Sequence, residues 1–185
     1  MNIIEPKVIQ RIYKDVLRGE QVEKTEKYLR DNAFLYKDSS NAPLDQLAYT
    51  VYTHKAGDAN KLGDLYWGTS ILEPLTVNGE CNMTKGHFHV NQDCAEYYFG
   101  ISGEGLLLLM DENGQTWAEK VFPGSLHYIN GALAHRLINI GDVRLEVGAC
   151  WPTAAGHDYE AVQKQPFAFR IYKTEDGIKA VRARP

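Results

Sequence analysis

The chain has 185 residues, of which 44% are hydrophobic and 24% are charged, and its formal net charge is −4. This composition is ordinary for one folded domain that buries a core without disulfide support. The mildly acidic balance excludes bulk electrostatic attraction to nucleic acid or to an anionic membrane, and we expect neither as a partner.

The cysteines and the N-terminus predict a cytoplasmic protein. Cys81, Cys94 and Cys150 are odd in number and form no C-x-x-C pair, so we expect free thiols in a reducing compartment. The N-terminal residues lack an apolar run of signal-peptide length with a small-residue cleavage site after it. No stretch approaches the roughly 18 apolar residues that span a bilayer.

The first expected element is an amphipathic helix over residues 8–17. Its apolar residues recur at three- and four-residue spacing, and Gly19 follows as a stop signal. These apolar residues are Val8, Ile9, Ile12, Tyr13, Val16 and Leu17. The charge-rich residues 22–31 fit either a short helix or an irregular arm. We assign residues 1–43 to an N-terminal helical or irregular extension.

From residue 44 onward the sequence predicts an all-β domain, 44–185, with a barrel or sandwich of antiparallel strands. Short runs rich in β-branched and aromatic residues alternate with turn formers. The runs are 47–54, 65–75, 79–90, 95–103, 104–111, 116–122, 125–130, 134–140 and 144–151. Asn113-Gly114 predicts a hairpin turn with positive φ at both residues, and the C-terminal residues predict one more hairpin.

Three histidines and a glutamate form a candidate metal site. His87 and His89 are two residues apart, so on a strand both imidazoles face the same side. Glu96 opens the next run, where a hairpin returns it beside them, and His135 lies on a further run. Three imidazoles and one carboxylate suit a divalent first-row metal with positions left for water or substrate.

The motifs around these residues resemble those of the cupin superfamily. His87-x-His89, Glu96 and Gly103 follow the order of the first cupin motif, and His135 with Asn139 follows the second. The stretches TKGHFH, AEYY, GISGEG, AHRLINIGD and AGHDY are similar to the cupin-type glucose-6-phosphate isomerases. This resemblance implies a jelly-roll β-barrel, a cytoplasmic homodimer and one divalent metal per chain, with Fe²⁺ favoured and Mn²⁺, Zn²⁺ or Ni²⁺ as alternatives.

The resemblance also implies a reaction and roles for single residues. It predicts the interconversion of glucose 6-phosphate and fructose 6-phosphate, a step of glycolysis and gluconeogenesis. Glu96 would ligate the metal and move a proton, while His157 would do further proton work and Tyr98 would contact the substrate. Tyr52, Thr84, Gly86 and Trp151 are the candidate phosphate contacts; Trp151 replaces a tyrosine common in the family. Lys85 is out of phase with Thr84 and Gly86, so we expect it to point away.

Two other readings remain open at this point. One is another metal-dependent cupin enzyme, a sugar epimerase or a dioxygenase. The other is a non-catalytic sugar-sensing cupin, although such proteins often lack metal ligands that this chain retains. The predicted homodimer rests on the family pattern and on the expected N-terminal helix, which a small barrel need not bury by itself.

Overall fold

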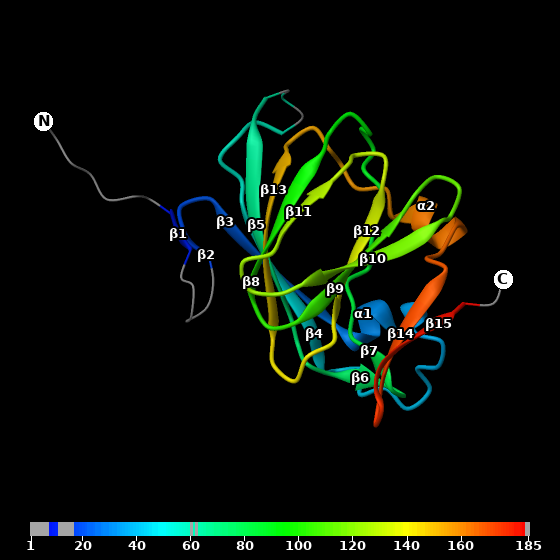
Figure 1. Cartoon of the computed structure of the whole chain (residues 1–185). Coiled ribbons are helices and arrows are strands. Elements are labelled where there is room, and N and C mark those ends of the chain that lie inside the picture. Colours follow the sequence, from blue (N-terminus) through cyan, green and yellow to red (C-terminus); the bar gives the residue numbers. More distant parts are fainter. Residues whose placement is uncertain (1–7, 11–16, 60, 62, 184–185) are drawn as a thin grey trace, which may run out of the picture.

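Antiparallel strands make up most of the molecule, as the sequence predicts (Figure 1). The structure is a computed structural model that describes residues 8–10, 17–59, 61 and 63–183. The largest sheet has six strands in the order β11(Leu126–Ile129), β8(Glu96–Ser102), β13(Leu145–Pro152), β5(Leu65–Leu72), β4(Leu47–His54) and β3(Val22–Tyr28). A second sheet has three strands in the order β10(Thr116–Val121), β9(Gly105–Met110) and β12(Ala134–Asn139).

Two further sheets complete the described strand arrangement. One has four strands in the order β15(Gly177–Arg182), β14(Phe169–Thr174), β7(Glu80–Cys81) and β6(Thr76–Val77). The other pairs β1(Val8–Gln10) with β2(Leu17–Gly19). The helical elements are α1(Leu29–Asn32), the 3₁₀ helix η1(Ala33–Leu35) and α2(Tyr159–Lys164). No described helix is long and apolar enough to cross a membrane.

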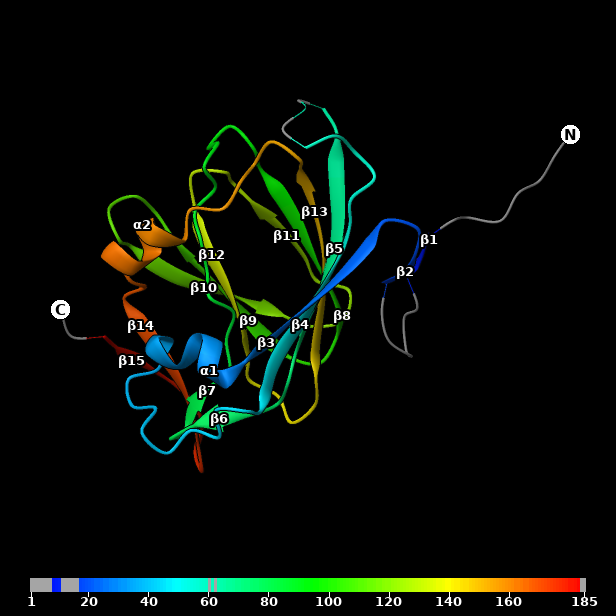
Figure 2. The same cartoon turned by 180° about the vertical axis from the view of Figure 1, so that it is seen from behind.

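The hydrophobic core combines residues of the six-stranded and the three-stranded sheets. Leu107 and Leu109 of β9 are buried in one cluster with Leu72 of β5, Val147 of β13 and Leu137 of β12. Figure 2 shows α1, α2, β14 and β15 grouped at one side of the molecule, away from β8. This all-β arrangement is the predicted cupin fold, and each run predicted from residue 95 to residue 151 contains a strand.

The predicted N-terminal helix is wrong for the residues that are described. Residues 8–10 and 17–19 form a strand pair, while residues 11–16 lie outside the described part. A short strand with β-branched residues satisfies the same apolar spacing as a helix, so the pattern alone does not separate them. Gln21 adopts φ +56° and the chain turns there directly into β3.

Residues 22–31 form neither a short helix throughout nor an irregular arm. Strand β3 occupies most of this segment and pairs with β4, and helix α1 starts at Leu29. Charged side chains on β3 suit its place at the edge of the sheet, because they discourage pairing with another chain. A strand of the main sheet thus lies within residues 1–43, and the division at residue 44 stays a prediction.

Both predicted hairpins are present, with one correction to the backbone. Strands β9 and β10 flank the Asn113-Gly114 turn, and β14 pairs with β15. Gly114 has φ +80°, but Asn113 is not among the described residues with positive φ. Asp111 Oδ1 instead accepts hydrogen bonds from the N–H groups of Asn113 and Gln115, at 2.9 and 2.8 Å, which closes the turn without a left-handed asparagine.

Candidate metal centre and active-site cavity

Three separate segments bring the four predicted metal ligands together. Glu96 is the first residue of β8, and His135 lies in β12, as expected. His87 and His89 lie on an extended segment beside β12 rather than on a regular strand. The β pairing of this segment consists of isolated bridges, among them His87 to His135 and Phe88 to Asp158. Gly86, at φ +74°, interrupts the strand geometry just before the histidines.

The ligand atoms of His87, His89, Glu96 and His135 lie within 4.8 Å of one another. Glu96 Oε1 is 2.6 Å from His135 Nε2 and 3.3 Å from His89 Nε2. Despite these distances, Oε1 and all three Nε2 atoms are buried without a hydrogen bond of acceptable geometry. Buried polar atoms are rarely left unpaired, so four of them aimed at one place fit a metal ion better than a mutual network.

Backbone carbonyls orient two of the imidazoles toward the centre. His89 Nδ1 donates to the Cys94 carbonyl at 2.6 Å, and His135 Nδ1 faces the Leu133 carbonyl at 3.3 Å. A carbonyl only accepts, so each ring carries its proton on Nδ1 and presents the Nε2 lone pair to the site. This outer hydrogen bond is the usual companion of a metal-ligating histidine.

Electrostatics favour the protonation states that metal ligation needs in Glu96 and His87, whereas at His89 burial is outweighed by the hydrogen bond and the charge of Glu96, which raise its pKa. Burial would raise the pKa of Glu96, but His135 and His89 outweigh it and bring the pKa to about 2. Burial is the main reason that the pKa of His87 falls well below its ordinary value, and the neighbouring histidines add to the effect. A carboxylate beside a neutral imidazole is the donor set that a divalent cation binds.

A cavity of about 170 Å³ opens above the cluster. Most of the predicted site residues line it, namely His87, Glu96, His135, Tyr98, Thr84, Gly86, Trp151 and His157. His89 is almost fully buried and lies behind the wall. Further lining residues, which no sequence pattern singled out, come from β4, β5 and α2, among them Tyr49, Val51, Thr53, Ser70 and Tyr159.

Two residues lie differently from expectation at this cavity. Tyr52 is not among the lining residues, because Tyr49, Val51 and Thr53 face the cavity and strand alternation turns Tyr52 to the other face. A phosphate contact by Tyr52 stays a prediction. Lys85 does line the cavity, contrary to expectation. The segment is not a regular strand there, so alternation does not apply, and Lys85 Nζ lies 4.5 Å from the centre of the Tyr159 ring.

The lining of the cavity includes donors for an anion. Thr84 Oγ1 accepts a hydrogen bond from the Leu137 N–H at 3.1 Å, and its own hydroxyl proton remains available. The Gly86 N–H makes no hydrogen bond to another described residue. Trp151 is held edge-on by Tyr66, with ring centroids 6.0 Å apart.

Two titratable side chains flank the cluster. The His157 ring lies 4.3 Å from the His87 ring and stacks on Tyr159 at 5.9 Å. Burial lowers the pKa of His157, and this favours its neutral form. The charge of Glu96 acts to raise this pKa, while His89 and His135 act to lower it further. Tyr98 lies 5.6 Å from the His135 ring, and burial together with Glu96 raises its pKa well above the ordinary value. It therefore stays a hydrogen-bond donor.

A two-layer antiparallel fold with this three-histidine, one-glutamate cluster defines a cupin with a candidate metal centre. The solved structure of Peruvianin-I from Thevetia peruviana latex, described as a cysteine peptidase, has the same fold with a TM-score of 0.50 at 22% identity. The matched region covers 69% of this chain and 77% of the Peruvianin-I chain. At this identity the likeness concerns the fold alone.

The sequence comparisons are more specific. The glucose-6-phosphate isomerase family matches residues 23–184. The glucose-6-phosphate isomerase of Thermococcus kodakarensis is 35% identical over 80% of this chain and 78% of its own length. That of Thermococcus litoralis is 37% identical over 76% and 73%. This chain belongs to the glucose-6-phosphate isomerase family.

Proposed function

We propose that this chain is a metal-dependent isomerase that interconverts glucose 6-phosphate and fructose 6-phosphate. The observation that carries the proposal is the convergence of four unpaired ligand atoms at a cavity whose lining also offers anion donors. A metal and a phosphate grip in one cavity suit a sugar phosphate. The membership of the family supplies the identity of the sugar.

The four side chains His87, His89, Glu96 and His135 would hold one divalent ion per chain. Nitrogen and oxygen donors suit Fe²⁺, which we favour, and also Mn²⁺, Zn²⁺ or Ni²⁺. A bound ion would supply Lewis-acid stabilisation of charge that develops on the substrate oxygens at C1 and C2. The protein residues would bind, orient and move protons around it.

The phosphate end of the substrate would lie against the Thr84 hydroxyl and the Gly86 N–H. The Lys85 ammonium and the Trp151 indole N–H can add to this grip, since both residues line the same cavity. With Tyr52 turned away, the anion would depend on the segment 84–86 more than the family pattern implies. The Tyr98 hydroxyl, next to Glu96 on the cavity wall, would donate to a sugar oxygen.

Proton transfer has two candidate carriers. Glu96 lies closest to the expected metal, but a carboxylate with a pKa of about 2 has little affinity for a proton. His157 is better matched to acid–base work, because it is neutral and contacts the His87 ring at the cavity wall. We therefore assign ring opening to His157 and keep the shuttle between C1 and C2 as the proposed role of Glu96.

A direct test measures isomerase turnover of the purified, metal-loaded chain with glucose 6-phosphate and with unphosphorylated glucose. We expect turnover of the phosphorylated sugar alone, and its loss on chelation with recovery on adding the metal back. Absence of turnover with bound metal would leave a metal-binding cupin of another activity, an epimerase or a dioxygenase. Absence of bound metal would favour a sugar-sensing cupin.

The protein would act as a cytoplasmic homodimer in glycolysis and gluconeogenesis. The N-terminal helix that first motivated a dimer is not present in the described residues. The outer face of β8 and β11 gives different support, because Tyr97, Phe99, Leu126 and Tyr128 are exposed there side by side. A patch of this kind is typical of a protein interface.

The dimer is tested by sedimentation of the wild type and of Leu126→Glu. Leu126 is 65% exposed in this patch. A glutamate at this position would bury a charge in the proposed interface, so we expect this variant to be a monomer. The matched control is Val143→Glu, since Val143 is 61% exposed in the loop between β12 and β13. A wild-type monomer at micromolar concentration would contradict the proposal.

A further inference from the structure

A second cavity, of about 910 Å³, lies on the other side of β12 from the first. Consecutive residues of β12 point to opposite faces, so His135 and Leu137 line the first cavity while Arg136 and Ile138 line the second. The other walls come from η1, α2, β14 and β15. Figure 2 shows α2, β14 and β15 grouped together. Nothing in the proposed isomerase reaction uses this space.

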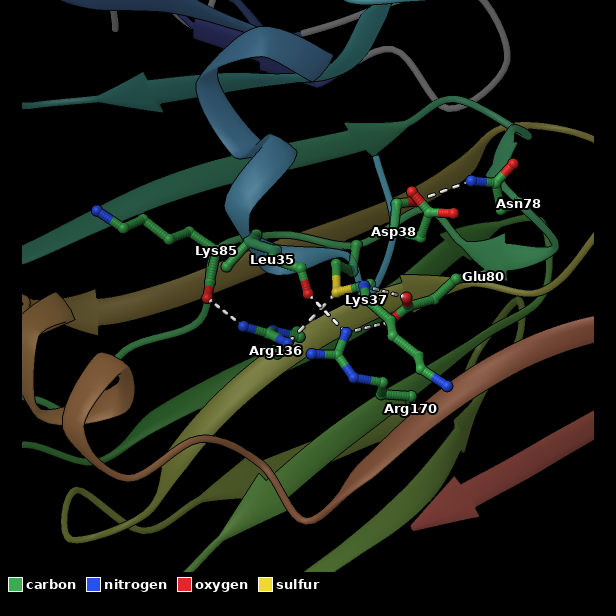
Figure 3. Close-up of polar contacts among 9 residues, drawn as sticks. Leu35, Lys37, Asp38, Asn78, Glu80, Lys85, Arg136 and Arg170 are labelled. Carbon is green, nitrogen blue, oxygen red and sulfur yellow. Dashed lines mark hydrogen bonds and ion pairs between the residues drawn. The ribbon is translucent and has the colours of Figure 1, made fainter. Parts of the chain in front are cut away.

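The charges that line the second cavity are strongly unbalanced. Its cationic lining residues are Lys37, Lys85, Arg136, Arg170 and Arg182, and its one described acidic lining residue is Glu80. Glu80 is only 2% exposed and both its oxygens are engaged. Oε1 accepts from Arg170 Nη1 at 2.8 Å, and Oε2 accepts from the Lys37 N–H at 2.9 Å (Figure 3).

Arg136 is left without a carboxylate partner among the described residues. Its Nη2 donates to the Lys85 carbonyl at 2.7 Å and its Nη1 faces the Met83 sulfur at 3.3 Å, a weak acceptor (Figure 3). Its Nε is buried and makes no hydrogen bond. Burial lowers the pKa of Arg136 to about 10. The charge of Glu80 acts to raise this pKa, and the charge of Arg170 acts to lower it. This partly buried guanidinium has no carboxylate hydrogen-bonded to it among the described residues.

Aromatic and aliphatic side chains form the rest of the wall. The Arg136 guanidinium carbon lies 4.8 Å from the centre of the Phe167 ring, so one face of the cation is covered by a flat apolar surface. Phe169, Tyr172 and Val162 continue this apolar lining. An inorganic ion would leave most of the volume unfilled, whereas an organic anion would use both the charge and the rings. Cavities of this volume commonly hold small organic ligands.

We propose that the second cavity binds a small organic anion, with its phosphate or carboxylate on Arg136 and Arg170 and its planar or apolar body against Phe167. Both anion types suit a guanidinium, because its N–H groups match two acceptor oxygens at once. Lys37 and Arg182 are exposed and would draw the anion toward the cavity. The site is distinct from the sugar-phosphate site, although Lys85 and Tyr159 line both.

The test is isothermal titration calorimetry on the full, metal-loaded chain, with and without glucose 6-phosphate. The probes are adenosine 5′-phosphate, benzoate and inorganic phosphate, which separate a phosphate source from a carboxylate source and from a bare ion. The readout is heat of binding and does not depend on isomerase turnover. We expect saturable binding of one organic anion, and weaker binding of inorganic phosphate.

Three variants decide where the anion binds. Arg136→Gln should weaken the affinity about tenfold or more, the usual scale for a hydrogen bond to a charged group. Val181→Glu, in case Arg136→Gln fails to fold, adds a negative charge at an exposed lining residue of β15 and should weaken binding similarly. Its control, Ile178→Glu, changes a similarly exposed residue on the same strand that does not line the cavity, and should bind as the wild type does.

Several outcomes would overturn the proposal. The first is absence of binding by every probe at millimolar concentration. The second is binding of inorganic phosphate alone. The third is binding that is unchanged in both Arg136→Gln and Val181→Glu, because the anion would then sit elsewhere, the sugar-phosphate cavity included.

Discussion

The two cavities share the wall formed by β12, yet the polar atoms left unpaired beside them require partners of opposite charge. In the first, three imidazoles and a carboxylate present lone pairs with no proton donor between them, so the missing partner is a cation. In the second, a guanidinium N–H is buried with no acceptor, so the missing partner is an anion. The sign of the charge on a missing partner thus follows from the kind of polar atom that the protein leaves unpaired.

The comparison also separates a preformed site from an adaptable one. The first cavity is small, and backbone carbonyls fix two of its imidazole rings through Nδ1. The second is larger, and two of its charged residues, Lys37 and Arg182, are exposed. Rigid placement suits chemistry on a single substrate, whereas the second arrangement suits recognition of charge and a flat surface.

The largest effect is expected from His89→Ala, which removes one of the four ligands. Metal content should fall steeply and isomerase turnover should fall with it, while the fold persists because the neighbouring strands keep their pairing. Elemental analysis of the purified variant and its circular dichroism spectrum check this. Anion binding in the second cavity should be unchanged, and a normal metal stoichiometry would remove His89 from the site.

Glu96→Gln and His157→Asn divide the proton work between the two candidates. In Glu96→Gln the new amide oxygen can still ligate a metal, so loss of turnover with metal retained would assign the shuttle to Glu96. Roughly 10²–10⁴-fold is the scale for removing a general acid–base group. His157→Asn should slow the reaction of the cyclic sugar more than that of a substrate supplied in open-chain form.

Steady-state kinetics with measured metal content separate these outcomes. Full activity in metal-loaded Glu96→Gln would contradict the shuttle role. Full activity in His157→Asn would limit His157 to packing on His87 and Tyr159.

A smaller effect, felt in both cavities, is expected from Gly86→Ala. A methyl group there would lie 3.0 Å from the Phe167 ring and 3.1 Å from Arg136 Nε, and the backbone has φ +74°. The left-handed backbone costs about 1–2 kcal/mol for a residue other than glycine, and crowding adds to this. Thermal unfolding should occur at lower temperature, and KM for the sugar phosphate should rise.

Gly124→Ala is the matched control for this variant. Gly124 has φ +90°, but a methyl group there would meet no other atom within 4 Å. It carries the same kind of backbone strain without the crowding, and it lies in the turn between β10 and β11. If both variants lose equal stability and keep the same KM, the contact between Gly86 and Arg136 does not connect the two cavities.

Local sequence patterns predicted the strands that frame the first cavity. Run 47–54 coincides with β4, and the four candidate metal ligands, which the structure brings together, were predicted because an alternating pattern and an acidic strand start are local features. The prediction of an N-terminal helix was wrong because apolar spacing over a few residues fits a short strand pair equally well. The prediction of a positive φ at Asn113 was wrong because hydrogen bonds to the Asp111 side chain close the turn instead.

The second cavity could not have been predicted in this way. Its lining residues run from Phe34 to Ala183 and meet only because β14 and β15 return beside η1 and β12. Arg136 is the one lining residue whose position follows from the local sequence. It is next to His135 on a strand, so its side chain lies on the face opposite that of the candidate ligand. Whether that face is solvent or a cavity depends on the tertiary fold.

The smallest effect is expected from Tyr52→Phe, which removes the hydroxyl that the family resemblance assigned to the phosphate. Tyr52 lies on β4 out of phase with Tyr49, Val51 and Thr53, which line the first cavity, and it lines neither cavity. KM for glucose 6-phosphate should therefore stay within about twofold of the wild-type value, since no hydrogen bond to substrate is lost. Thr84→Val is the comparison, because it deletes a hydroxyl that does line the cavity and should raise KM by about tenfold. If Tyr52→Phe raises KM as much as Thr84→Val does, the phosphate reaches across the sheet edge to Tyr52. The first cavity would then extend beyond the walls described, and the assignment of the phosphate to the segment 84–86 would have to be revised.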